Sequence, residues 1–192
     1  MKNFLTILVL SLFLITPSWA DDIRDYQIEG MSIGDSALDY FTKEEIKARK
    51  TNYYKNNKFT AIENNYLESF EIFDFVDFNY KTNDRDYIIQ GLSGIISYKN
   101  NIKDCDKKMD EIVSDLSKVF KEGSRRSEKK IIKHSVDKSG KSITAKVTFW
   151  FDSGNFASVN CHNYSEETGY QDHLNVSFKT KEFNDFLKIA YD

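Results

Sequence analysis

Proline, cysteine and histidine are scarce in this chain of 192 residues. It has one proline, Pro17, and no stretch rich in proline, glycine or serine divides the rest, so we expect a single domain over residues 21–192. Its two cysteines are too few for a disulfide-dense scaffold. Its three histidines are scattered along the chain and too few for a recognisable zinc site, so we expect neither a metal ion nor a cofactor.

A large excess of one charge is also missing. The chain has 27 basic and 30 acidic residues, which gives a formal net charge of −3. A weakly acidic chain has no overall attraction for nucleic acid, so nucleic acid is not an expected partner. The hydrophobic content of 40% and the aromatic content of 15% are typical of globular proteins and exclude the disordered and collagenous classes.

The first 20 residues have the pattern of a secretory signal peptide. Lys2 provides a positive start, residues 4–15 form an apolar run, and Ser18, Trp19 and Ala20 fit the small-x-small cleavage pattern. The run is shorter than the ~20 residues that cross a bilayer as a helix, and no later segment approaches that length. A retained anchor is the alternative. We expect cleavage after Ala20 and a periplasmic or secreted mature chain without a transmembrane segment.

Hydrophobic periodicity predicts a pair of short helices, a group of strands, a long helix, a second group of strands and a closing helix. The long helix is expected at about 104–122, because its apolar residues recur at the spacing of one buried helix face. The strands are expected at 58–63, 70–78, 86–99, 143–151, 156–162 and around 174–178. Short connections indicate an antiparallel sheet, so the expected fold is an α+β two-layer sandwich with the helices on one face.

The two cysteines are expected to form a disulfide. Cys105 lies on the apolar stripe of the long helix, and Cys161 shares its strand face with Ala157 and Val159. In an oxidising compartment, two inward-facing cysteines on packed elements favour a covalent link. The alternative is a reactive thiol, since Cys105 would sit at a helix N-terminus and His162 follows Cys161. Adjacent strand residues face opposite ways, so His162 is poorly placed to activate that thiol.

Two serines near the predicted mature N-terminus lie in patterns found in serine hydrolases. Residues 30–34 match G-x-S-x-G around Ser32, and residues 34–37 resemble the first block of the SGNH (GDSL) hydrolases around Ser36. The first pattern requires a sheet that precedes the serine, and none is predicted. The second family completes its triad with a D-x-x-H pair, which none of the three histidines provides. We expect Ser36 to cap a helix.

A basic segment follows the long helix and is the candidate patch for an anionic partner. Its members are Lys118, Lys121, Arg125, Arg126, Lys129, Lys130 and Lys133. No aromatic residue is interleaved with them, which argues against stacking on single-stranded nucleic acid. The segment is either a solvated helix end and loop, or a docking patch for an envelope protein or an anionic envelope component.

Three aromatic residues are a candidate exposed patch. Phe73 and Phe75 fall on the strand face opposite Ile72 and Val76, and Trp150 lies opposite Val147 and Phe149. Such side chains are either covered by loops or exposed to a partner.

The turn and cap motifs together carry a resemblance. They are Ile28-x-Gly30-x-Ser32-Ile33-Gly34-Asp35-Ser36, Glu44-Glu45-Ile46, Asp137-x-Ser139-Gly140, and Phe151-x-Ser153-Gly154 before Cys161. In these the chain resembles a group of uncharacterised exported proteins from Pelagibacter-like, AT-rich alphaproteobacteria. The resemblance implies a periplasmic setting and no particular activity. We expect an exported, non-enzymatic binding or interaction protein with no catalytic residues. The alternative is a small secreted SGNH-like serine hydrolase that uses Ser36 or Ser32.

Overall fold

The computed structural model describes residues 23–190 except 52, 100, 121–122 and 135–136. The predicted signal peptide and its cleavage point after Ala20 lie outside the described residues. None of the helices that the structure describes has the length and apolar content of a membrane-spanning segment.

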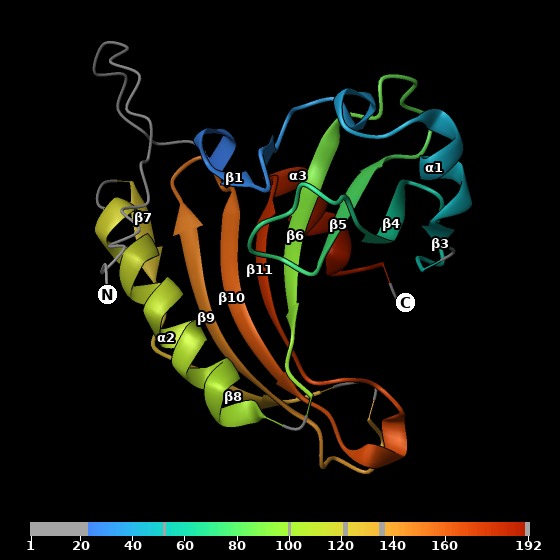
Figure 1. Ribbon diagram of the computed structural model, residues 1–192. Helices are drawn as coiled ribbons and strands as arrows, with labels where there is room; N and C mark the ends of the chain where they lie inside the picture. Colours follow the sequence, from blue (N-terminus) through green and yellow to red (C-terminus); the bar gives the residue numbers. More distant parts are fainter. Residues whose placement is uncertain (1–22, 52, 100, 121–122, 135–136, 191–192) are drawn as a thin grey trace, which may run out of the picture.

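A nine-stranded antiparallel sheet organises the chain (Figure 1). The strand order is β3-β4-β5-β6-β11-β10-β9-β7, and β8 also pairs with β9. The strands are β3 (Lys50–Thr51), β4 (Phe59–Asn65), β5 (Phe75–Lys81), β6 (Ile89–Ser97), β7 (Ser124–Arg126), β8 (Lys130–Lys133), β9 (Ile143–Phe151), β10 (Phe156–Asn163) and β11 (His173–Lys179). The predicted antiparallel α+β fold is therefore confirmed.

One face of the sheet, here called the apolar face, holds the main core. Directly paired residues form a buried row across six strands: Ile62, Phe78, Leu92, Phe178, Ala157 and Phe149. Helix α2 (Ile102–Val119) packs on this row through Met109 and Val113, which are buried. The disulfide of Cys105 with Cys161 links α2 to β10.

The N-terminal elements cover the rest of the apolar face. They are η1 (Ile23–Asp25), β1 (Gln27–Ile28), β2 (Met31–Ser32), η2 (Ala37–Asp39) and α1 (Lys43–Ala48). Each contributes a buried apolar side chain to the main core, Ile46 of α1 among them. The predicted capping box that starts α1 is present, because Thr42 and Glu45 bond each other's backbone N–H groups.

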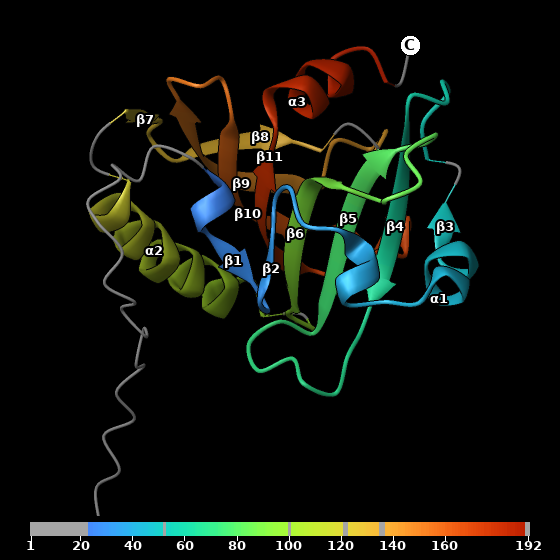
Figure 2. The same ribbon diagram turned by 90° about the horizontal axis from the view of Figure 1, so that it is seen from above.

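Helix α3 (Lys181–Leu187) lies on the opposite face, as Figure 2 shows from above. Its Phe183 and Phe186 pack with Phe59 in a second hydrophobic cluster. Gly91 makes room for this helix, since a Cβ atom there would lie 2.4 Å from the Phe183 ring. The expected placement of all helices on one face is not confirmed, because α3 uses the faces of β4 and β6 that turn away from the main core.

The sequence analysis did not anticipate the two strands β7 and β8. All four residues of β8 are exposed, including Ile131 and Ile132, so their pattern shows none of the alternation of a half-buried strand. The long helix begins two residues earlier than predicted, at Ile102, and ends at Val119, whose side chain is 54% exposed. After α2 the chain therefore returns to the sheet and adds β7 and β8 at its edge.

Candidate functional site

The face of the sheet that carries α3 holds most of the polar strand residues, and we call it the polar face. Directly paired residues of antiparallel strands point to the same side, so register assigns its members. They include Thr148, Ser158, Ser177, Ser93 and Asp77 in one row, and Lys146, Asn160 and Asn175 in the next. Ser158 and Ser177 are 1% and 0% exposed, so polar groups are buried here where apolar side chains would stabilise the fold more.

The buried groups of the polar face form a short hydrogen-bond network. The hydroxyl oxygens of Ser158 and Ser177 are 3.0 Å apart, and the Asn160 amide Nδ2 donates to the Ser158 hydroxyl at 3.2 Å. Asn160 is 9% exposed, and its Oδ1 has no partner among the described residues. Buried acceptors of this kind nearly always have a donor in native proteins. The amide oxygen has less than 1 Å² of exposed surface, so a donor from outside the chain reaches it only when the side chains that cover it move aside.

Two lysines flank one aromatic ring on the same face. The Nζ atoms of Lys146 and Lys179 each lie 5.5 Å from the centre of the Phe156 ring. Burial, and then the charge of Lys146, lowers the pKa of Lys179 to about 8, and burial lowers the pKa of Lys146. Neither lysine makes a salt bridge within the described part of the chain. Two half-buried ammonium groups thus share a small region without a counter-charge.

More cationic and aromatic groups continue this region toward the sheet edge. Arg125 of β7 pairs with Trp150, and Lys130 of β8 pairs with Lys146, so all four belong to the polar face. Arg125 and Lys130 are exposed, and Trp150 is 39% exposed. We call Arg125, Lys130, Lys146 and Lys179 the cationic track.

A cavity and two carboxylates lie on the other half of the polar face. The cavity has a volume of about 210 Å³, and its lining includes Tyr54, Glu63, Asp77 and Lys179. Burial, helped by the charge of Glu63, raises the pKa of Asp77 to about 7, although the Asn64 N–H donates to this carboxylate at 2.7 Å. The polar face therefore carries cationic groups on one side of β6 and acidic groups on the other.

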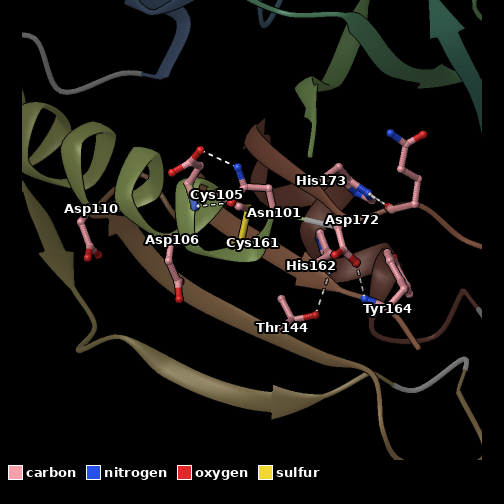
Figure 3. Close-up of a disulfide and its surroundings, with 12 residues drawn as sticks. Asn101, Cys105, Asp106, Asp110, Thr144, Cys161, His162, Tyr164, Asp172 and His173 are labelled. Atoms are coloured by element: carbon pink, nitrogen blue, oxygen red, sulfur yellow. Dashed lines mark hydrogen bonds between the residues drawn. A yellow bond between two sulfur atoms is a disulfide. The ribbon is translucent and has the colours of Figure 1, made fainter. Parts of the chain in front are cut away.

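All three histidines meet where β9, β10 and β11 approach the η3 loop (Glu166–Thr168). The rings of His162 and His173 are 4.6 Å apart between centres, and those of His134 and His162 are 5.5 Å apart. His162 Nδ1 is hydrogen-bonded to the Thr144 hydroxyl at 2.9 Å (Figure 3). The Tyr164 hydroxyl lies 3.1 Å from His134 Nε2. Burial, and then the charges of His173 and His134, lowers the pKa of His162 to about 3, so its ring is neutral at pH 7.

The sequence predicts that His162 and His173 approach one another if their strands pair, and the direct pairing of β10 with β11 places them side by side. The addition of His134 was not predicted, because it lies far away in sequence. Among the described residues, no group of three or more His, Cys, Asp or Glu side chains is arranged to hold a metal ion.

The predicted disulfide is confirmed. The Sγ atoms of Cys105 and Cys161 are 2.01 Å apart, and their Cα atoms 6.0 Å apart. Cys161 points to the apolar face and its neighbour His162 to the polar face, as Figure 3 shows. The disulfide therefore anchors α2 on one side of β10 while the other side is left for polar side chains.

The predicted basic patch does not form one surface. Lys118 pairs with Asp115 at 2.8 Å, and Lys129 pairs with Asp106 and Asp110, each at 3.1 Å. These two lysines are therefore neutralised by α2. Lys121 lies outside the described residues.

The remaining members of that patch divide between the two faces. Arg126 and Lys133 pair with Phe149 and Ile143, which places them on the α2 side of the sheet. Only Arg125 and Lys130 belong to the polar face, because side chains alternate along β7 and β8.

The predicted aromatic patch is likewise divided. The Phe73 ring lies over Gly94 on the apolar face, since a Cβ atom on Gly94 would come within 2.6 Å of it. Phe75 lies on the polar face of β5, and Trp150 lies four strands away on β9. Only Trp150 stands beside the cationic track.

The two hydrolase-like serines have structural roles. Ser36 caps η2: its hydroxyl accepts from the Leu38 N–H at 3.2 Å and donates to the Asp86 carbonyl oxygen at 2.6 Å. Ser32 is 6% exposed, and its N–H donates to the Asp35 carboxylate at 2.8 Å. The three histidines lie together around Thr144 and Tyr164 instead.

The sequence analysis missed Lys146, Asn160 and Lys179. These residues occupy the polar positions of alternating strands, which usually face solvent. The sequence carries one sign of this buried polar surface: the neighbouring residues Ser158, Ser177 and Asn175 are small and uncharged. A strand face that is exposed to solvent is normally rich in charged residues. Comparison with models of known protein families gives no match. Comparison with curated protein sequences gives no match either.

Proposed function

We propose that this chain is an exported, non-enzymatic binding protein that holds a polar organic ligand on the polar face of its sheet. The observation that carries the proposal is the unpartnered Oδ1 of Asn160, in a side chain that is 9% exposed. A buried acceptor without a donor destabilises the folded state, and a ligand hydroxyl or amine would satisfy it.

The surroundings of Asn160 support ligand binding. The hydroxyl groups of Ser158 and Ser177 next to it can turn to donate or accept. The cavity of about 210 Å³ opens on the same face, beside Lys179 and under α3. Binding sites commonly combine a pre-formed hollow with a few convergent polar groups.

Export is supported by the N-terminal pattern and by the disulfide. Residues 1–20 have the order of features of a cleaved signal peptide, and the Cys105–Cys161 link is of the kind that persists in oxidising compartments. A periplasmic or secreted location follows from these two features. The ligand is then a component of the envelope or of the surrounding medium.

A binding role without catalysis is supported by the use of Ser36. Its hydroxyl is held between two backbone groups as a helix cap, and among the described residues it makes no hydrogen bond to a histidine or carboxylate side chain. We expect a fluorophosphonate probe to leave the exported protein unlabelled. Labelling that disappears in Ser36→Ala or Ser32→Ala would replace the binding proposal by hydrolysis.

The binding proposal is tested through tryptophan fluorescence. After removal of residues 1–20, Trp150 is the single tryptophan of the chain, and it lies on the polar face. We expect the emission of Trp150 to change in a saturable way when the protein is titrated with members of a library of hydroxylated metabolites and short saccharides. Native mass spectrometry of the protein as exported should show the complex directly.

Two matched variants decide whether the polar face is responsible. Asn160→Leu removes the unpartnered acceptor with little change of size and should abolish the fluorescence response. Asn83→Leu changes an exposed asparagine between β5 and β6 and should leave it intact. A library without any response, or equal binding by both variants, would contradict the proposed function.

A further inference from the structure

We infer that the ligand of the polar face is a short acidic saccharide, whose carboxylate, sulfate or phosphate group binds between Lys146 and Lys179. This inference rests on the proposed function and names the chemical class of the ligand. It follows from the cationic track, from the two aromatic rings along it and from the hydrogen-bonding groups beneath it.

The pair formed by Lys146 and Lys179 favours the binding of an anion. The two Nζ atoms lie equally far, 5.5 Å, from the Phe156 ring and have no carboxylate partner among the described residues. The charge of Lys146 disfavours the charged form of Lys179, and an anion placed between the two lysines would oppose this effect. Charge-assisted hydrogen bonds from two lysines to one acidic group are short and strong.

The track is longer than one small anion. Lys179 lies on β11 and Lys146 on β9, and Lys130 lies on β8 beyond it. Neighbouring strands are about 4.8 Å apart, so the track extends roughly 14 Å across the sheet. Arg125 stands beside Trp150 at the outer end. An extended ligand with several acidic groups fits this spacing better than a single inorganic ion.

The other groups of the face favour a sugar over other anions. Trp150 is 39% exposed, and its ring offers an apolar surface on which a sugar ring can stack. Asn160 Oδ1 has no donor among the described residues; sugar hydroxyls supply donors, whereas an ionised phosphodiester does not. The net charge of −3 opposes binding of long nucleic acids, whose affinity depends on a large positive field.

The experiment compares charged and neutral forms of the same saccharides. Trp150 emission is titrated with short oligogalacturonate, a sulfated oligosaccharide and a phosphorylated oligosaccharide. Each is paired with its neutral form, the methyl ester or the unsubstituted sugar. We expect at least one acidic form to bind about tenfold or more tightly than its neutral form, and this difference to shrink as salt is raised.

The lysine pair is tested by a double variant. Lys146→Gln/Lys179→Gln removes both charges and leaves polar side chains one atom shorter; the variant should lose about tenfold or more in affinity for the acidic form, with affinity for the neutral form little changed. The control is Lys103→Gln/Lys107→Gln, which removes two exposed charges from α2 and should bind like the parent chain. Circular dichroism verifies that both double variants are folded.

The outcomes separate this inference from the proposed function. If neutral sugars or other polar metabolites bind and the acidic forms have no advantage, the polar face is a binding site but the acidic ligand class is wrong. If the acidic forms bind equally well to both double variants, the lysine pair is not the anion site. If no compound of either panel changes Trp150 emission, the inference and the proposed function fail together.

Discussion

The two faces of the sheet are made by neighbouring residues of the same strands. Phe78, Leu92, Phe178, Ala157 and Phe149 form the buried apolar row, and the adjacent residues Asp77, Ser93, Ser177, Ser158 and Thr148 form the row behind it. The apolar face is closed by α2, the disulfide and the N-terminal segments. Among the described helices, α3 is the one on the polar face; it packs through a small aromatic cluster, and its Glu182 pairs with Lys58 and Lys81.

The apolar face stabilises the fold, and the polar face is the one for which we propose a binding function. Apolar burial on one face stabilises the fold by about 25 cal/mol per Å² of surface removed from water. On the other face, unpaired lysines, a carboxylate with a raised pKa and an unpartnered amide all work against folding. Such groups are expected where binding has been favoured at the expense of stability. Substitution of the groups that oppose folding, such as Lys179 and Asp77, should therefore raise the free energy of unfolding, whereas substitutions in the apolar core should lower it.

The largest effect is expected on the apolar side, at the disulfide. Cys105→Ala/Cys161→Ala opens a link between positions 56 residues apart and should lower the free energy of unfolding by about 4 kcal/mol. Denaturant unfolding of parent and variant measures the loss. Reductant should weaken the parent and leave the variant unaffected. A loss below ~1 kcal/mol would mean that α2 is held mainly by packing.

A smaller loss is expected from a cavity beneath α2. Met109 is fully buried, so Met109→Ala should cost about 3 kcal/mol. Ser177→Ala is its counterpart on the polar face, since Ser177 is equally buried. It removes one hydrogen bond, to Ser158, and should cost no more than about 1 kcal/mol. Equal losses of unfolding free energy at the two positions would contradict the proposed difference between the faces.

Substitution of Lys179 is expected to raise the free energy of unfolding instead of lowering it. Its pKa is about 8 in the folded chain and near its ordinary 10.5 in the unfolded chain. The penalty for burying the charge is full below pH 8 and is relieved as pH rises from about 8 to 10.5. Lys179→Met should therefore raise stability at pH 7 by an amount on the order of 1 kcal/mol, and the gain should vanish by pH 10.5. A destabilised variant at pH 7 would show that the ammonium has a partner.

Substitution of Asp77 should also raise the free energy of unfolding, by a smaller amount and in a lower pH range. Its pKa is raised from an ordinary 3.8 to about 7, so ionisation of the unfolded chain between these values lowers stability as pH rises. Asp77→Asn keeps an acceptor for the Asn64 N–H and should stabilise the chain at pH 8 but not at pH 3.5. Thermal midpoints at the two pH values measure this. A gain that does not depend on pH would exclude ionisation as its cause.

Much of the apolar face could be predicted from the sequence. The strand Ile143–Phe151 and the buried stripe with Cys105 and Met109 were identified because alternation and helical spacing are local properties. The disulfide followed from two inward-facing cysteines.

The polar face could not be predicted in the same way. Its lysines, Lys146 and Lys179, come together through β10, and neither lies near the other in sequence. The position of α3 depends on Gly91, whose missing side chain admits Phe183 from the far side of β6. Strands β7 and β8 form by pairing with β9, although their own residues are exposed and basic. Each of these features is set by long-range pairing, which local periodicity does not record.

The most direct measurement is the urea midpoint of two chains, each with and without a short acidic oligosaccharide. The parent chain should be stabilised by the saccharide, because a ligand that binds only the folded state shifts the unfolding equilibrium. Lys146→Gln/Lys179→Gln should begin with a higher midpoint than the parent and should not respond to the saccharide. A variant that is less stable than the parent, or that gains as much from the saccharide, would contradict the assignment of the polar face to binding.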